Sequence, residues 1–388
     1  MNPLKKYLDS IKPNFEPGGK LQAFGSVFEG FESFLFVPNT TSKSGTHIHD
    51  AVDSKRIISF VIIALVPALL FGMYNIGYQN ALLANGGKLP ADACHFTMFV
   101  YGFLQMLPKI LVSYIVGLAI EFAWAQWKHE EIQEGYLATG ILIPMIIPVN
   151  CPLWCIAIAC AFSVIFCKEI FGGTGMNFVN PALAARAFLF FSYPTVMSGD
   201  NCWVAKDQIF GLGYQVADAT TAATPLGLIT QNPDYCVDTM NAVIGLIPGS
   251  MGETSFVAII LGALFLLFTG VASWRIMLSV FAGGILTSWM FTSLGMTTQP
   301  WWDQIVLGGF AFGAVFMATD PVTAARTECG KWIYGFLIGF VAIVVRVMNP
   351  GYPEGMMLAI LLMNVCAPLI DWCVVQRNIS RRANRLKK

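Results

Sequence analysis

The sequence predicts an all-α integral membrane protein with about ten transmembrane helices. Hydrophobic residues make up 56% of the 388 residues and charged residues only 12%, whereas a soluble domain carries about 25% charged residues. The apolar residues fall into ten runs bounded by Gly, Pro, Asn or charged residues, and about 20 apolar residues make a membrane-crossing helix. The net charge is zero, so nothing in the composition indicates a nucleic-acid partner.

The ten runs differ in length, and several must tilt, break or thin the bilayer in order to cross it. Pro108 is expected to split the second run, and Pro144 and Pro148 to bend or end the third. Such breaks should face protein or a cavity, because lipid leaves a free backbone group without a partner. The runs cover residues 57–75, 98–126, 135–149, 152–168, 180–194, 254–270, 274–294, 303–318, 331–347 and 354–375.

Ten crossings put both termini on one side of the membrane, and the basic residues indicate which side. With cytoplasmic termini, eighteen of the 23 lysines and arginines fall in cytoplasmic segments, while the outer loops hold only Lys88 and Lys206. The positive-inside rule therefore predicts cytoplasmic termini. No cleavable signal peptide is expected, because the first 55 residues are polar.

This topology divides the chain into five segments. They are a cytoplasmic N-terminal arm at 1–56, a first transmembrane block at 57–194, an outer-face connection at 195–252, a second transmembrane block at 253–375 and a basic cytoplasmic tail at 376–388.

The outer connection contains small residues packed around hydroxyl groups. Alanines leave the hydroxyl of Thr224 sterically open, and an acid stands six positions before it, so that a bulky redox cofactor could be attached there. The stretch reads Asp218-Ala219-Thr220-Thr221-Ala222-Ala223-Thr224-Pro225.

A glycine-rich turn precedes the fifth run. Its glycines would let the backbone approach a flat ligand closely, and the helix start that follows offers free N–H groups. A tight interhelical turn is the alternative. No Gly-Lys-Ser/Thr follows, so it is not a Walker loop. The turn reads Phe171-Gly172-Gly173-Thr174-Gly175-Met176-Asn177-Phe178-Val179-Asn180-Pro181.

One stretch of the second block echoes this helix start. Asn180-Pro181-Ala182-Leu183-Ala184-Ala185-Arg186 is similar to Asp320-Pro321-Val322-Thr323-Ala324-Ala325-Arg326. In both, Asn or Asp before Pro is the signature of a helix start. The echo is explained either by an internal repeat, which is common in transport folds, or by similar capping alone.

Acidic residues within apolar runs are costly and usually functional. Glu121 and Asp371 are therefore candidates for a cation path, while Asp320 is either functional or a helix cap. Asp303 and Glu354 are expected at the interface, and Arg186 and Arg346 could neutralise acids or bind a phosphate or carbonyl oxygen.

The ten cysteines include four beside one apolar run, Cys151, Cys155, Cys160 and Cys167. Buried small hydrophobes are the favoured interpretation, because no CxxC pair indicates an iron–sulfur site. A disulfide between Cys202 and Cys236 is a further alternative.

These motifs together resemble those of one family, the B subunits of the sodium-translocating NADH:quinone reductases (Nqr). The D subunit of Rnf complexes shares the membrane core but lacks the long arm. The resemblance covers nearly the whole chain and rests on Phe15-Glu16-Pro17-Gly18-Gly19-Lys20, Asp53-Ser54-Lys55-Arg56, Gly172-Gly173-Thr174-Gly175, Asn180-Pro181-Ala182-Leu183-Ala184, Ala318-Thr319-Asp320-Pro321, Asn349-Pro350 and Pro353-Glu354-Gly355-Met356-Met357.

The resemblance implies two flavins and a fold. FMN would be joined through its phosphate to Thr224, with Asp218 and Thr221 as the other motif residues and Ala222 in place of the usual Gly. A noncovalent riboflavin would lie near Gly173, Asn177 and Asn180. The implied fold is a ten-helix bundle similar to urea transporters.

The resemblance also implies quinone and sodium sites. The quinone would lie near the aromatic N-terminal arm and near Gly117 and Leu118. The family often has Gly where Leu118 stands. Alternatively, the N-terminal arm docks another subunit. Sodium movement would involve Glu121, Asp320 and Asp371.

The implied activity is that of an NADH:ubiquinone reductase (Na+-transporting) in a bacterial inner membrane. Electrons from NADH would enter through other subunits of a six-subunit complex, reach FMN, pass to riboflavin and leave to quinone. A flavin transferase would attach the FMN. The rivals are a ferredoxin-linked Rnf-type subunit and a solute channel without a redox role.

Overall fold

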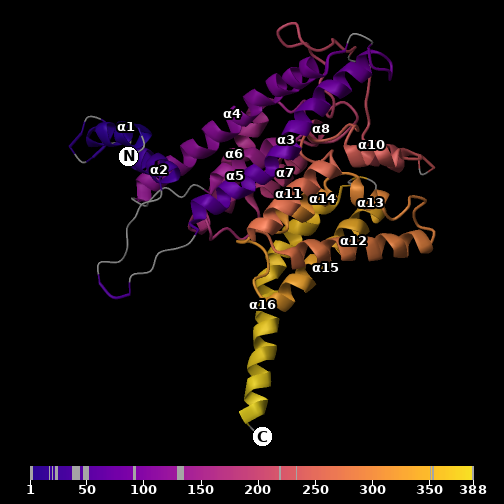
Figure 1. Cartoon of the computed structure of the whole chain (residues 1–388). Helices are drawn as coiled ribbons and strands as arrows, with labels where there is room; N and C mark the ends of the chain where they lie inside the picture. Colours follow the sequence, from indigo (N-terminus) through magenta and orange to yellow (C-terminus); the bar gives the residue numbers. More distant parts are fainter. Residues whose placement is uncertain are drawn as a thin grey trace.

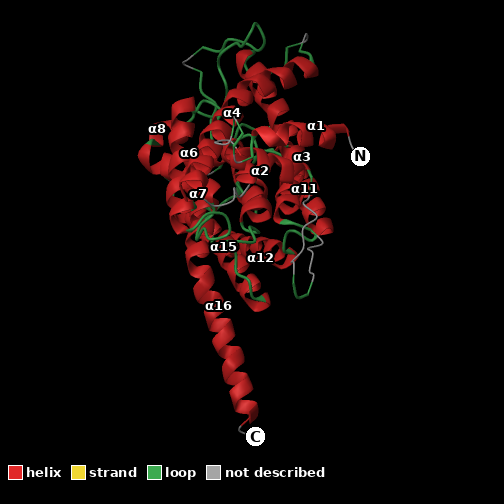
Figure 2. Cartoon of the chain, turned by 90° about the vertical axis from the view of Figure 1, so that its left-hand side faces the viewer, coloured by secondary structure: helices red, strands yellow, loops and turns green. Residues whose placement is uncertain are grey.

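Helices are the only extended secondary structure in the part of the chain that the computed structural model describes (Figures 1 and 2). That part is residues 3–386 without 17, 20, 22–24, 37–43, 47–51, 91–92, 129–134, 218–219, 233, 350 and 352–353. An isolated bridge between Ile209 and Leu212 is its one β-type pairing. The all-α prediction is confirmed for these residues.

The first two long helices are α3 (Ser54–Ala84) and α4 (His95–Lys128). Asp53 caps α3 by accepting a 2.9 Å hydrogen bond from the Arg56 amide. The predicted split at Pro108 is wrong, since α4 continues through this proline. Proline is tolerated inside membrane helices because neighbouring helices and small local adjustments compensate for the lost bond.

Short helices follow. They are α5 (Tyr136–Ile146), α6 (Leu153–Cys167), η3 (Glu169–Phe171) and α7 (Pro181–Ser192). The third apolar run ends as predicted, because α5 stops two residues before Pro148. The outer connection then holds α8 (Pro194–Met197), α9 (Pro225–Gln231) and α10 (Thr239–Ile244).

The second block consists of α11 (Phe256–Thr269), α12 (Trp274–Ser293), α15 (Glu328–Met348) and α16 (Met356–Leu386), with a broken segment between α12 and α15. Among the described residues, six helices are long and apolar enough to cross a membrane: α3, α4, α6 with η3, α12, α15 and α16. The protein is therefore multi-pass. The helices α5, α7 and α11 are apolar but shorter, and ten crossings stay a prediction.

The broken segment occupies the run 303–318. It consists of α13 (Asp303–Val306), α14 (Phe310–Phe312) and the π-helix η4 (Gly313–Met317). The chain turns at Gly308, whose φ of 65° suits glycine. Arg346 donates a 3.2 Å hydrogen bond to the Leu307 carbonyl, so a side chain satisfies the non-helical backbone, as a membrane interior requires.

Helices α12 and α15 lie side by side (Figure 1) and touch backbone to backbone. A β-carbon added to Gly283 would collide with the Phe336 carbonyl, and one added to Gly339 would collide with the Val280 carbonyl. Small residues allow this close packing, which replaces the hydrophobic driving force that lipid does not supply.

The described residues nearest to the two termini are helical. The arm contains α1 (Pro3–Ile11), η1 (Lys12–Asn14) and α2 (Gly25–Leu35), joined by a 2.8 Å ion pair between Lys12 and Glu32. The basic tail continues α16 as far as Leu386, and its end extends away from the body of the molecule (Figures 1 and 2).

Candidate functional site

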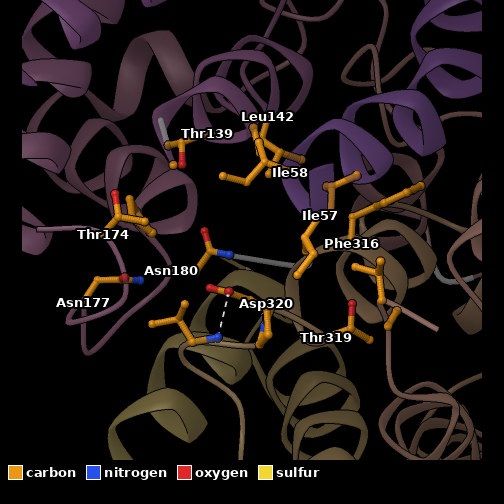
Figure 3. Close-up of a pocket in the computed structure, with 18 of the residues that line it drawn as sticks. Ile57, Ile58, Thr139, Leu142, Thr174, Asn177, Asn180, Phe316, Thr319 and Asp320 are labelled. Atoms are coloured by element: carbon orange, nitrogen blue, oxygen red, sulfur yellow. Dashed lines mark hydrogen bonds between the residues drawn. The ribbon is translucent and has the colours of Figure 1, made fainter. Parts of the chain in front are cut away.

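A large cavity lies where the two transmembrane blocks meet (Figure 3). Its volume is about 160 Å³. One wall is apolar, with Ile57, Leu142 and Phe316 among its residues. The polar side chains that line it are Thr139, Lys168, Thr174, Asn177, Asn180, Thr319 and Asp320.

The two members of the sequence echo meet at this cavity. Figure 3 shows the side chains of Asn180 and Asp320 facing the same central space. Asn180 caps α7 as predicted, accepting from the amides of Ala182 at 3.0 Å and Leu183 at 3.3 Å. The echo therefore brings two polar side chains to one site.

Asp320 does not start a helix, so that interpretation is wrong. Its carboxylate accepts from the Val322 amide at 3.1 Å and the Thr323 hydroxyl at 3.0 Å, but the residues after it form a turn and α15 begins only at Glu328. Thr327 is the cap of α15, accepting from the Gly330 amide at 3.1 Å. Asp320 is a half-buried carboxylate at the cavity wall.

The glycine-rich turn forms another wall. Gly172, Gly173 and Gly175 have φ angles of 115°, 88° and 92°, which only glycine adopts readily. They place Thr174 and Asn177 at the cavity. The Thr174 hydroxyl is buried with no partner among the described residues, which leaves it available to a ligand.

Glu121 lies behind the cavity wall. It forms a buried ion pair with Lys168, which does line the cavity. Its second carboxylate oxygen, Oε2, has no partner in the described part of the chain. The structure thus connects Glu121 to the large cavity through Lys168.

The quinone candidates Gly117 and Leu118 lie on α4 about one turn before Glu121. The ring of Tyr136 packs directly on Gly117, so that even a β-carbon there would collide with it. The Tyr136 hydroxyl donates to the Ser113 carbonyl at 3.0 Å, and Leu118 is half-buried. Gly117 is covered in this arrangement, and quinone binding at these positions stays a prediction.

Asp371 is not among the residues that line the large cavity. Its carboxylate accepts from the amides of Arg326 at 2.8 Å and Thr327 at 3.0 Å, and from the Thr327 hydroxyl at 2.5 Å. It therefore holds the start of α15 against α16.

The predicted attachment residue, Thr224, lines a second, small cavity. It caps α9 by accepting from the Gly227 amide at 3.2 Å. Thr224 is half-buried and Thr221 is exposed. Asp218 lies outside the described residues.

A buried ion cluster forms the floor of the small cavity. Arg186 donates to Glu253 at 2.5 Å and also pairs with Glu354, and both glutamates line this cavity. Arg186 thus neutralises acids, one of its predicted roles, and Glu354 is a member of the cluster. Glu253 was not predicted as a site residue, because it carries no local motif.

Helix α7 connects the two cavities. Asn180 at its start lines the large cavity, and Arg186 lies six residues farther on at the small one. At 1.5 Å per residue the separation along the helix is about 9 Å.

The cysteines are not cross-linked. All ten thiols are free, so the alternative of a Cys202–Cys236 disulfide is wrong. Cys236 is exposed, whereas Cys202 is buried, and burial raises the pKa of the Cys202 thiol to about 12. Cys151, Cys155, Cys160 and Cys167 are buried, as the favoured interpretation predicts.

Comparisons with known proteins agree with the sequence resemblance. The model of the NQR2, RnfD, RnfE family matches residues 41–380. A protein of Chromohalobacter salexigens is 44% identical over 98% of this chain and 96% of its own length, one of Pseudoalteromonas atlantica 43% identical over 99% of each, and one of Klebsiella pneumoniae 41% identical over 98% and 99%. Each of the three is named as the B subunit of a Na(+)-translocating NADH-quinone reductase. The chain belongs to the NQR2, RnfD, RnfE family.

Proposed function

We propose that the chain is the B subunit of a Na+-translocating NADH:quinone reductase in a bacterial inner membrane. The relatives that bear this name match it over nearly its full length, including the arm. Its partners would then be the other subunits of a six-subunit complex, quinone, sodium ions and membrane lipid.

The position of Thr224 carries the cofactor part of the proposal. Its hydroxyl is half-buried at a cavity, and its neighbours Ala222 and Ala223 leave space for a large substituent. We infer that a flavin transferase joins FMN to this oxygen through its phosphate. Thr221 is exposed beside it, where the transferase could contact it.

The large cavity would hold the noncovalent riboflavin. Its apolar residues would take the flat face of the ring system, and the polar groups among its lining residues would take its edge and its hydroxylated chain, a composition typical of cofactor sites. Asn177, Asn180 and the unpartnered Thr174 hydroxyl would hold it. When bound, the two flavins supply the redox chemistry, and the protein supplies position and electrostatics.

The same cavity supports the proposed coupling to sodium. Asp320 and the Lys168–Glu121 pair place three charged groups at or directly behind its wall. In a low-dielectric site a change of one charge strongly alters the affinity for a nearby cation. Sodium affinity at Glu121 and Asp320 would therefore respond to the charge in the cavity, with Asp371 supporting the adjacent loop. Quinone would bind near Gly117, Leu118 and the arm.

The attachment site is tested by flavin fluorescence of the denatured protein on a gel. Wild type, Thr224→Val and the matched control Thr220→Val are each expressed with the flavin transferase. Fluorescence in wild type and Thr220→Val, and none in Thr224→Val, is expected. A wild-type band without fluorescence would contradict covalent flavin and favour a solute channel.

A further inference from the structure

The small cavity has room for one small particle. Its volume is about 20 Å³, close to the space that a single water-sized sphere needs. It is lined by the polar residues Thr224, Ser250, Glu253, Thr254 and Glu354, together with Pro225, Leu226 and the segments 247–249 and 307–308. Residues with hydroxyl and carboxylate groups therefore form part of its wall.

One of these oxygens has no partner. Thr254 is 3% exposed, and its Oγ1 makes no hydrogen bond to any described residue. A buried hydroxyl without a partner is destabilising. The adjoining Ser250 shows the contrast, because its hydroxyl donates to Glu253 Oε2 at 2.5 Å. The Thr254 hydroxyl thus indicates a ligand that completes its bonding.

The charges around the cavity balance. Glu253 and Glu354 share Arg186. The guanidinium of Arg346, behind Gly308, bonds the carbonyl groups of Gln304 and Leu307. The net charge of the cluster is therefore zero before a cation enters. The cation would be held by contacts with individual oxygen atoms and not by an excess of negative charge. Such a site binds weakly enough to release its ion, which ion conduction requires.

We propose that the small cavity binds one sodium ion through Thr254 Oγ1 and the carboxylates of Glu253 and Glu354. Small hard cations prefer oxygen ligands of these kinds. The inference rests on the proposed function in one respect, since the ion would be the transported one. The site would lie next to the FMN attachment residue and close to Arg186 in the middle of α7, six residues along the helix from Asn180.

The test compares unfolding temperatures of the purified full-length chain in sodium chloride and in potassium chloride at equal ionic strength. The chain is produced without the flavin transferase, so that the result does not depend on flavin. Sodium should raise the unfolding temperature of wild type in a concentration-dependent way, because a ligand that binds only the folded state stabilises it. Potassium, a larger ion, should not.

Thr254→Val removes the hydroxyl and keeps the shape of the side chain. We expect it to lose the part of the sodium-dependent rise that comes from the small cavity, and so to respond less than wild type, while remaining at least as stable as wild type in potassium, because an unpartnered hydroxyl is replaced by a methyl group. Ser288→Ala is the matched control. It removes another buried hydroxyl without a described partner, on α12 and not among the residues lining the small cavity, and should keep the full sodium response.

A sodium response of equal size in wild type and Thr254→Val would overturn the proposal. The absence of a sodium response in wild type would also overturn it and would mean that the cavity holds a water molecule. If valine is not accommodated, Thr254→Ala gives the same comparison. A failure of covalent flavinylation at Thr224 would not affect this result, so the two proposals fail separately.

Discussion

Lys168 and Glu121 form a buried ion pair that joins the end of α6 to α4, and Lys168 lines the large cavity. Their side chains are only 6% and 4% exposed. Breaking such a pair leaves an uncompensated buried charge, so each partner controls the charge that the cavity presents. This gives the two residues opposite expected effects on sodium.

Glu121→Gln should lower the apparent sodium affinity of quinone reduction by the assembled complex about tenfold, the effect of losing about 1.4 kcal/mol. Lys168→Met should raise it, because the cation that competes for the carboxylate is removed. The measurement is quinone reduction by each variant over a range of sodium concentrations. Unchanged sodium dependence in both variants would exclude this pair from the sodium path.

Asn177→Ala should reduce the amount of riboflavin bound by the chain. Asn177 lines the large cavity, and its one described side-chain bond is a 3.2 Å contact from its amide to the Val179 carbonyl, so its loss should affect ligand more than fold. Asn180→Ala should lose riboflavin and also about 1 kcal/mol of stability, because it removes the cap of α7.

The measurement for both variants is the riboflavin released by denaturation per mole of chain. Asn232→Ala, an exposed asparagine in the outer connection, is the control and should release the wild-type amount. Full riboflavin content in both cavity variants would place the cofactor elsewhere.

The predictable parts of the molecule are those governed by local sequence or by the bilayer. Long apolar runs predicted α3, α4, α12, α15 and α16, because a membrane requires every backbone group to be bonded within a helix. The Asn-Pro pair at Asn180 predicted the start of α7, since capping depends on neighbouring residues.

Other parts depend on distant contacts and were not predictable. Arg186 meets Glu253, 67 residues away, and Glu354, 168 residues away. No local pattern marks such partners. Asp320 has the same local signature as Asn180 but caps a turn, because the chain after it is held by Asp371 of α16. Tertiary contacts decided the outcome at both positions.

Asp371→Ala should lower the apparent sodium affinity and destabilise the protein by about 1 kcal/mol, and Asp371→Asn should largely restore both. The reason is that Asp371 accepts the amides of Arg326 and Thr327, and an asparagine oxygen can still accept them. It would then act by positioning the loop that follows Asp320. Sodium titration and thermal unfolding of both variants provide the measurement. If Asp371→Asn loses as much sodium affinity and stability as Asp371→Ala, the negative charge of Asp371 is required and its role as a hydrogen-bond acceptor is not sufficient.

The predicted topology is testable with the native cysteines. Cys236 in the outer connection and Cys329 at the start of α15 are both exposed, and the charge pattern assigns them to opposite sides of the membrane. In single-cysteine variants, a membrane-impermeant maleimide should label Cys236 in intact cells and Cys329 only after permeabilisation.

Cys202 serves as the internal control for this experiment, because it lies in the same outer connection as Cys236 but is buried. Burial raises the pKa of its thiol to about 12, so at pH 8 the thiol is protonated, and only the thiolate reacts. A variant with Cys202 alone should stay unlabelled at pH 8 until the protein is denatured. Labelling of Cys329 but not Cys236 in intact cells would show that the topology is the reverse of the predicted one. Thr224 would then lie on the cytoplasmic side, away from the face predicted for its flavin.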